Sequence, residues 1–344
     1  MAATVLEPQK KKTRLMTEGS IWKSILLFSV PLILGNLLQQ LYNTADSIIV
    51  GNFVGSNALA AVGSSGSPIF LLIGFSQGIA VGAGVVVAQY LGAKDREDAQ
   101  RAVHTALALA VLLGLILTIG GILVSRALLT AMDTPAEVLE DAVTYIQIYF
   151  GGVLFSVIYN MAAGILNAAG NSRRSVLYLA CASITNIILD LVLIAGLKMG
   201  VAGAAIATVF SQMVSCVLVL TCLCRTEGSY KLSFSKLSMK GYYLKQIFQV
   251  GIPAGIQSTV INFSNVLLQS SVNSFGSIAM AGYTAANNIF GFLYVSVNAI
   301  TQACMSFTSQ NYGAGDFQRC KKVYRLCMIF SVIFCGLLSG VFVL

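Results

Sequence analysis

Two aspartates lie inside long apolar stretches of this 344-residue chain, where acidic side chains are rare. Eleven of the 13 acidic residues fall in charged or polar segments, and only Asp46 and Asp190 do not. A carboxylate at membrane depth costs about 2.5–3.5 kcal/mol on insertion scales, so it usually faces a bundle interior and serves a function. Asn186 lies one helical turn before Asp190, and Thr208 is expected at a similar depth in the next apolar stretch. These oxygen ligands suit a hard cation, so the four residues are predicted to bind one. Hydrogen bonding between helices is the alternative role for Asn186 and Thr208.

Polar side chains also recur at helical spacing within several apolar stretches. Asn36, Gln40 and Asn43 follow one another at steps of four and three, and a similar series recurs around Asn262 and Asn265. Packing between helices explains any single stripe, but matching stripes in two stretches favour a shared water-filled cavity. Its aromatic side chains and its lack of cations suit amphipathic or cationic organic molecules. The residues predicted to line the cavity are Asn36, Gln40, Asn43, Tyr149, Asn160, Asn262, Asn265, Asn287 and Tyr294.

The composition requires these residues to lie in a membrane. The chain is 56% hydrophobic and 10% charged, whereas an ordinary soluble domain is about 25% charged. So few charges cannot cover a soluble fold of this size, and the same numbers exclude disorder, a coiled coil and a disulfide-stapled secreted domain. The apolar runs are continuous, so they do not fit the alternating strands of a membrane β-barrel. We therefore predict an all-α polytopic membrane protein.

Charged residues divide the chain into nine membrane-spanning segments, because about 20 apolar residues cross a bilayer as a helix. The predicted helices cover about 24–48, 58–90, 102–125, 142–168, 175–197, 201–224, 244–272, 279–311 and 324–344. Pro31 lies early in the first of them. Proline removes a backbone hydrogen bond and makes a bend easier, so Pro31 is predicted to act as a hinge.

The positive charges predict the orientation. If the N-terminus is cytoplasmic and the helices alternate, 19 of the 21 Lys and Arg residues fall on the cytoplasmic side. Only Arg126 and Lys198 fall on the other side. This bias follows the positive-inside rule and predicts a multi-pass protein of the cell membrane with a cytoplasmic N-terminus. The net charge of +8 is thus a consequence of topology in a lipid bilayer and needs no nucleic-acid partner.

The eight cysteines and the single histidine indicate neither a metal site nor a catalytic centre. Cys222 and Cys224 have no His or acidic neighbours, so apolar packing is favoured over metal binding. His104 has no histidine partner and is expected to be a polar residue at the membrane interface. A hydrolase would need a base beside its nucleophile, and no such pair is visible. We predict a protein that is not an enzyme and that has no catalytic residue, transition-metal site or cofactor.

Part of the sequence occurs twice, and the copies keep one constant spacing. The segment Gly55–Ala60 resembles Gly276–Ala281, and Gln89–Asp95 resembles Gln310–Asp316. Both copies start on the same side of the membrane, which is typical of a parallel repeat in a two-lobe transporter. The predicted parts are a cytoplasmic tail (1–23), a lobe of six helices (24–224), a cytoplasmic linker (225–243) and a partial lobe of three helices (244–344). If the second lobe mirrors the first, three of twelve helices are missing after Leu344, so a C-terminal truncation is expected.

The order and spacing of several short segments resemble the multidrug and toxin extrusion (MATE) family along the whole chain. These segments are Pro31, 43–46, 50–51, 55–61, 89–93 and 186–190. The resemblance implies twelve helices in two lobes and export of organic cations driven by inward Na⁺ or H⁺. It also implies a cation site in the first lobe, which maps onto Asp46, Asn186, Asp190 and Thr208. Some members carry a further acid in the seventh helix, and this chain has none in its seventh or eighth.

The prediction is therefore a monomeric, cation-coupled antiporter that exports small amphipathic or cationic organic molecules by alternating access, with Na⁺ or H⁺ as coupling ion. A flippase for lipid-linked saccharides or peptidoglycan precursors is the alternative, since it would share the two-lobe repeat. Such a flippase is expected to hold pyrophosphate with cations in its cavity, and the predicted cavity has none. A membrane scaffold would not need paired buried acids. A channel is disfavoured because no Gly-rich filter segment stands out.

Overall fold

The computed structural model describes residues 16–132, 134–273 and 277–343, except for some side chains within the helices. Over these ranges the chain forms nine α-helices and two short helical segments. The α-helices are α1 (Ile21–Phe53), α2 (Ser56–Gly92), α3 (Arg96–Ala131), α4 (Ala136–Ala168), α5 (Ser172–Asp190), α6 (Gly200–Arg225), α7 (Gly241–Asn273), α8 (Ser277–Gly313) and α9 (Phe317–Val343). A π-helical segment, η1 (Leu191–Gly196), continues α5, and a 3-10 turn, η2 (Phe234–Lys236), precedes α7. The predicted all-α fold is confirmed.

Within the described residues, six stretches are long and apolar enough to cross a membrane. They are Ile21–Phe53, Ile73–Gly92, Arg96–Ala131, Ala136–Ala168, Ser172–Gly196 and Gly200–Arg225. Large apolar side chains also lie on the outer surface of the bundle, for example Ile119 and Leu123 on α3, which are 60% and 75% exposed. A soluble fold exposes few clusters of this kind, whereas lipid chains solvate them. The structure therefore agrees with a polytopic membrane protein.

Most helices extend beyond their predicted ends. The sequence places the third helix at about 102–125, whereas α3 begins at Arg96 and ends at Ala131. The Asp95 side chain caps its start by accepting a hydrogen bond from the Asp98 backbone N–H at 3.0 Å. The predicted boundaries followed the charge-free runs, but charged residues also form the first and last helical turns, which lie outside the hydrocarbon region.

The repeat is visible in the two turns that join α2 to α3 and α8 to α9. Asp95 caps α3, and Asp316 caps α9 by accepting from the Arg319 backbone N–H at 2.9 Å. The Ala93 N–H donates to the Gln89 carbonyl at 2.9 Å, and the Ala314 N–H donates to the Gln310 carbonyl at 3.0 Å. The same backbone conformation thus recurs in the second copy, as the repeated sequence predicts.

These two turns differ at one left-handed position, which gives a testable prediction. Lys94 has φ +59°, and its repeat counterpart Gly315 has φ +75°. A left-handed residue with a Cβ is strained, so Lys94→Gly is expected to stabilise the fold by about 1 kcal/mol. The thermal unfolding midpoint of the purified protein in detergent measures this gain. Lys94→Ala removes the same charge but keeps the Cβ, so it is expected to give no such gain. A lower midpoint for Lys94→Gly would contradict the prediction.

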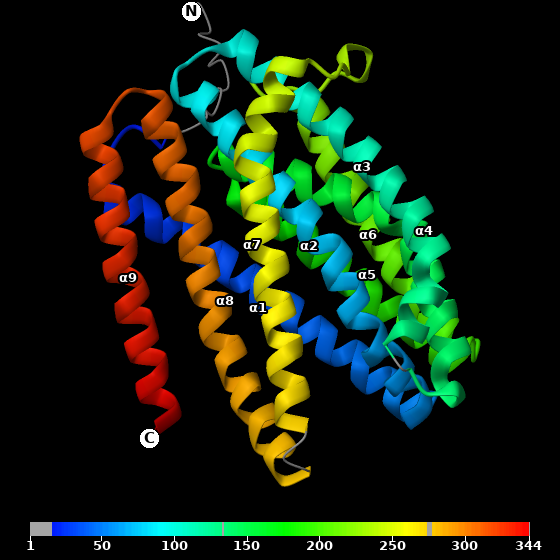
Figure 1. Cartoon of the computed structure of the whole chain (residues 1–344). Coiled ribbons are helices and arrows are strands. Elements are labelled where there is room, and N and C mark those ends of the chain that lie inside the picture. The colour runs from blue at the N-terminus through cyan, green and yellow to red at the C-terminus, as the bar shows by residue number, and fades with distance from the viewer. Residues whose placement is uncertain (1–15, 133, 274–276, 344) are drawn as a thin grey trace, which may run out of the picture.

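Two ends of the bundle can be distinguished. We call the end with residues 16–20, the α2–α3 turn, the α4–α5 turn, residues 226–240 and the α8–α9 turn the linker end, which lies at the top of Figure 1. The last turn of α7 and the first turn of α8 lie at the opposite end, and α9 lies at the edge of the bundle beside α8 (Figure 1). In this view α1 runs diagonally behind α7 and α8, and it packs against α5 and α8.

The segment between α6 and α7 is bound along α3. The Ser233 backbone N–H donates to Nε2 of His104 at 3.0 Å, and the Thr105 hydroxyl donates to the Ser238 carbonyl at 3.2 Å. Nδ1 of His104 contacts the Gln100 carbonyl at 2.6 Å. The imidazole is buried. Through its hydrogen bond to Ser233 it anchors the connection between the two predicted lobes to the first lobe.

Glycines allow α2 and α7 to pack backbone against backbone. A Cβ atom on Gly78 would lie 2.2 Å from the Cα of Gly255, and one on Gly82 would lie 2.7 Å from the Cα of Gly251. In membranes, small residues spaced four apart allow helices to approach closely and gain van der Waals contact. Here they join one helix from each predicted lobe.

A second apolar cluster joins the other repeat-related helix pair. Phe28 of α1 meets Phe307 of α8 edge to face, with ring centroids 5.7 Å apart. Ile25, Leu32 and Ala303 are buried around them. Contacts between the predicted lobes thus run from α1 and α2 to α7 and α8. The exact lobe boundaries at 24–224 and 244–344 stay a prediction, and the predicted tail 1–23 is described only from Met16.

Candidate functional site

The two buried aspartates lie together in the structure. Asp46 is on α1 and Asp190 is the last residue of α5, and these two helices pack side by side. Asp190 is completely buried, and Asp46 is 9% exposed. Their carboxyl groups are direct neighbours and interact with each other. The convergence that the sequence predicts for these two residues is therefore present in the fold.

Asn186 adds an amide to this pair. It lies one turn before Asp190 on α5 and is also completely buried. Within the described structure, Oδ1 and Nδ2 of Asn186, both carboxylate oxygens of Asp190 and Oδ1 of Asp46 have no hydrogen-bond partner. Buried polar atoms are nearly always hydrogen-bonded, so five unpaired atoms in one place are what the predicted cation site would leave open. The cation site itself stays a prediction.

Thr208 approaches the site from α6. It is buried, and its hydroxyl donates to the Ala204 carbonyl at 3.0 Å. Its side chain also interacts with that of Tyr145 on α4, which in turn lies near Asp46. Thr208 is thus connected to the aspartates through Tyr145. The four predicted cation-site residues therefore come from α1, α5 and α6 and face the same region of the bundle.

Tyrosines surround the carboxylates. Tyr42 lies one turn before Asp46 on α1 and is close to both aspartates and to Tyr149. Tyr145 and Tyr149 are stacked on α4 with ring centroids 6.4 Å apart. The Gln212 side-chain amide donates to the Tyr149 hydroxyl at 3.3 Å. Tyr42 and Gln212 were not predicted, although the spacing of Tyr42 to Asp46 places both on one face of the helix.

The site holds two acidic side chains without a basic partner from the described residues. The groups that interact with the two carboxylates there include no Lys, Arg or His. In the part of the chain that the structure describes, no three His, Cys, Asp or Glu side chains converge on a metal site. Carboxylate, amide and hydroxyl oxygens are the ligands of hard cations, and a carboxylate pair can also share a proton. These residues therefore fit a proton or a hard monovalent cation.

The chain changes its helical form directly after Asp190. The sequence predicts one continuous α-helix over 175–197, whereas the structure has α-helix to Asp190 and π-helix from Leu191 to Gly196. The Leu197 N–H therefore bonds to the Val192 carbonyl, five residues back, at 2.9 Å. Single π-turns are rare and often lie at functional sites, because the wider turn displaces neighbouring side chains. No residue pattern in Leu191–Gly196 predicts this π-helical turn.

The predicted cavity residues are spread over several helices. Tyr149 and Asn160 are half-buried on α4, and the Asn160 amide contacts the Ser156 hydroxyl at 3.5 Å. On α7, Asn262 lies against Gly74 of α2, since a Cβ atom on Gly74 would be 3.4 Å from its Nδ2. The remaining described members are Asn36, which is half-buried, and Gln40, Asn43, Asn265 and Tyr294, which are exposed. The side chain of Asn287 lies outside the described residues.

The structure brings only part of this set together. Among the described side chains, no hydrogen bond joins two of the predicted cavity residues. Tyr149 alone also belongs to the surroundings of the aspartates. The polar lining of a single cavity by all nine residues therefore stays a prediction.

Pro31 lies inside α1, one turn beyond Phe28. The Ser172 hydroxyl at the start of α5 donates to the Phe28 carbonyl at 3.1 Å. Farther along α1, a Cβ atom on Gly35 would lie 2.9 Å from a methyl carbon of Val176 on α5. The proline therefore lies in a part of α1 that is closely packed on α5, and its predicted role as a hinge stays a prediction.

Comparison with known proteins identifies relatives of this arrangement. The sequence model of the MatE family matches residues 31–192 and 253–344. The probable multidrug resistance protein YoeA of Bacillus subtilis is 31% identical over 335 residues, which are 95% of this chain and 72% of that protein. The multidrug export protein MepA of Staphylococcus aureus is 23% identical over 94% of this chain and 72% of its own length.

Solved structures share the fold. A structure described as the outward-facing conformation of a multidrug resistance MATE family transporter of the MOP superfamily has a TM-score of 0.88 and 28% sequence identity. It covers 95% of this chain, which corresponds to 73% of that structure. A MOP superfamily transporter from Pyrococcus furiosus also has a TM-score of 0.88, at 28% identity over 95% of this chain and 73% of its own. Its description states that the reverse polarity of its binding pocket suggests a different function.

Proposed function

This chain belongs to the MatE family, and from that premise we propose that it is a cation-coupled antiporter that exports small organic molecules across the cell membrane. The names of its relatives as multidrug resistance and multidrug export proteins support export of organic compounds. The proposal of cation coupling rests on one observation: Asp46 and Asp190 are neighbours and are buried without a basic partner among the described residues. In this proposal the protein is a transporter and has no catalytic residue.

The proposed coupling follows from the charge of the pair. Two neighbouring carboxylates repel each other strongly where water is excluded. One proton or one Na⁺ bound between them, with Asn186 and Thr208 as further oxygen ligands, removes this repulsion and draws α1 towards α5. Because Pro31 interrupts the backbone hydrogen bonds of α1, a bend in that helix costs little. The occupancy of the pair would thereby bias the shape of α1 and of the substrate cavity beside it.

The proposed orientation places the linker end in the cytoplasm. Most of the positive charges of the chain lie in the α2–α3 turn, the α4–α5 turn, the segment 226–240 and the α8–α9 turn together with the helical turns that adjoin them, and the opposite end carries Arg126 and Lys198. Arg126 is also paired with Glu140. By the positive-inside rule, loops that stay in the cytoplasm carry an excess of Lys and Arg. The organic substrate would then enter from the linker end and leave at the opposite end.

The proposed substrates are amphipathic or cationic organic molecules. Tyrosine rings beside the carboxylates present apolar faces with a negative potential, which attract organic cations. Asp46 is the carboxylate with residual exposure, so a cationic substrate and the coupling cation would oppose each other there. That competition is the physical basis of exchange.

The test is dye efflux from cells that express the full chain, with Na⁺ and pH gradients imposed separately. Ethidium export that follows one of the two gradients is the expected result, and it identifies the coupling ion. A vector-only strain measures the background efflux. If no cationic dye is exported although the protein is inserted in the membrane, the proposal fails and the lipid-linked flippase becomes the leading alternative.

A further inference from the structure

One repeated motif has no role in the cation site. Gln89 to Gly92 forms the last turn of α2, and Gln310 to Gly313 forms the last turn of α8. The two copies are far apart in sequence and match in the repeat. Both turns lie at the linker end of the bundle, one in each predicted lobe. The fold packs them directly against each other.

The contact is reciprocal. A Cβ atom on Gly92 would lie 1.9 Å from the carbonyl oxygen of Gln310, and a Cβ atom on Gly313 would lie 1.9 Å from the carbonyl oxygen of Gln89. Real Cβ atoms do not approach other atoms this closely, so each position requires glycine as long as the two helix ends touch. Each copy of the motif therefore supplies the glycine that accepts the backbone of the other copy.

The Gln310 side chain fastens this contact. It is completely buried, and its Nε2 donates to the carbonyl of Ala168, the last residue of α4, at 2.5 Å. Its Oε1 accepts from the Met16 backbone N–H at 2.8 Å. A carbonyl at a helix C-terminus has no partner within its own helix, so Gln310 satisfies an atom of the first lobe from the second.

The residues before α1 strengthen the same junction. We call Met16–Ser20 the strap. Arg319 of α9 donates to the Gly19 carbonyl at 2.9 Å, and the Asn311 amide contacts the Met16 carbonyl at 3.5 Å. The Met16 side chain is buried in the cluster that also holds Phe28 and Phe307. The strap thus lies across the ends of α8 and α9 and leads directly into α1.

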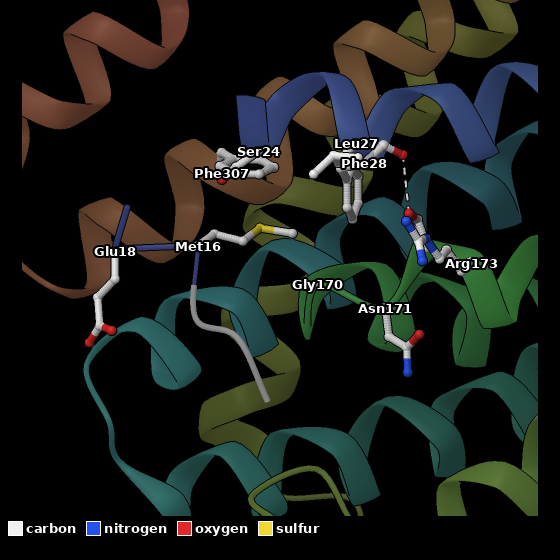
Figure 2. A pocket seen from close by; sticks show the side chains of 10 residues that line it. Met16, Glu18, Ser24, Leu27, Phe28, Gly170, Asn171, Arg173 and Phe307 are labelled. Atoms are coloured by element: carbon white, nitrogen blue, oxygen red, sulfur yellow. Dashed lines mark hydrogen bonds between the residues drawn. The ribbon is translucent and has the colours of Figure 1, made fainter. Parts of the chain in front are cut away.

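The junction encloses space as well as contacts. Figure 2 shows a pocket between the strap, the start of α1, the α4–α5 turn and α8. Its volume is about 280 Å³. Met16, Phe28 and Phe307 line it together with Asn171 of the α4–α5 turn and Arg173 of the first turn of α5. Because part of the space between these helix ends is empty, their separation breaks fewer packed contacts than it would in a fully packed core.

We propose that this junction is the cytoplasmic gate of the transport cycle, closed by the reciprocal Gly92–Gly313 contact and latched by Gln310. The inference rests on the proposed transport function, which requires the linker end to open and close. It adds the positioning residues that hold the closed state, none of which touches the cation site. Opening separates the ends of α2 and α8 and leaves both polar ends of the Gln310 side chain to water.

The experiment measures the gate directly. Spin labels at Arg96 and Gln318, which are exposed in the first turns of α3 and α9, report the distance across the junction by pulsed electron resonance. The labels are attached to a variant in which the eight native cysteines are replaced by alanine. This variant must transport dye as the parent protein does. The parent is expected to show a short-distance population in the absence of a gradient. Gln310→Ala is expected to raise the ratio of open to closed gate on the order of tenfold, as expected for the loss of buried hydrogen bonds.

Gly92→Ala and Gly313→Ala are expected to produce the same opening, since either methyl group blocks the contact from its own side. Gly120→Ala on α3 is the matched control, because no atom lies within 4 Å of its Cβ position. Unchanged distances in folded Gln310→Ala and glycine variants would overturn the gate. If the glycine variants do not fold, the distances in Gln310→Ala decide the question.

Failure of the gate and failure of the proposed function give different results. If the distances shift in the variants but the parent exports no dye, the gate is supported and the cationic dyes are rejected as substrates. Gradient-coupled export by the parent with distances that never shift would reject the gate and leave the transport function standing.

Discussion

Asp190→Asn and Asp46→Asn are each expected to abolish cation-coupled efflux while leaving the protein folded in the membrane. Asparagine has nearly the same shape as aspartate, so the packing of α1 on α5 is retained. It carries no charge, so the site no longer attracts a proton or Na⁺. The affinity of the site for the coupling cation is expected to fall on the order of 100-fold or more.

Two measurements on purified protein in liposomes test this. Isotopic Na⁺ uptake or proton release upon addition of dye measures coupling, and dye export measures transport. Asp141→Asn is the control, because Asp141 is exposed in the first turns of α4 and its replacement makes the same change in charge. Coupled export at the parental rate in both site variants would show that the pair is not the coupling site.

The sequence predicts the aspartate pair for a simple physical reason. A charge within an apolar helix is so costly that its position alone indicates a buried role. Helical spacing then places Asn186 beside Asp190 without any knowledge of the fold. The rest of the site depends on helix packing. Tyr145 reaches Thr208 because α4 packs against α6, and it comes near Asp46 because α6 packs against α5 and α5 against α1.

The helices themselves are predictable to within a few turns. Their existence follows from uninterrupted apolar runs, and the structure confirms nine of them in the residues it describes. Their ends are less predictable, because Arg96, Glu97 and Asp98 form the first turn of α3 although they are charged. The π-segment after Asp190 is not predictable from these residues, since Leu191–Gly196 is an ordinary apolar sequence.

Polar stripes are the weakest part of the sequence argument. Helical spacing places Asn36, Gln40 and Asn43 on one side of α1, but it does not determine what that side faces. In the structure Asn36 is half-buried, whereas Gln40 and Asn43 are exposed. Which of these residues contact substrate depends on how far the two lobes separate. The repeated sequence alone does not predict the distance between the lobes.

The repeat, in contrast, has consequences that reach beyond either copy. Ala299 and Ala303 of α8 are the repeat counterparts of Gly78 and Gly82 of α2, and both alanines are completely buried. The α8–α1 contact therefore tolerates a methyl group at positions where the α2–α7 contact has none. The two interfaces between the lobes are built on the same plan, but the α2–α7 interface is the closer of the two.

This difference predicts a large effect of small substitutions in α2. Gly78→Ala and Gly82→Ala place a methyl group against the backbone of α7, because their Cβ positions lie 2.2 Å and 2.5 Å from backbone atoms of Gly255 and Ile247. Overpacking costs about 1–3 kcal/mol even where side chains can adjust, and a helix backbone adjusts less. The thermal unfolding midpoint in detergent is therefore expected to fall by about 5 °C or more for each variant. Gly63→Ala in the same helix is the control, since nothing lies within 4 Å of its Cβ position, and it should leave the midpoint unchanged. Equal midpoints for Gly78→Ala and Gly63→Ala would mean that α2 and α7 do not pack backbone to backbone in the folded protein.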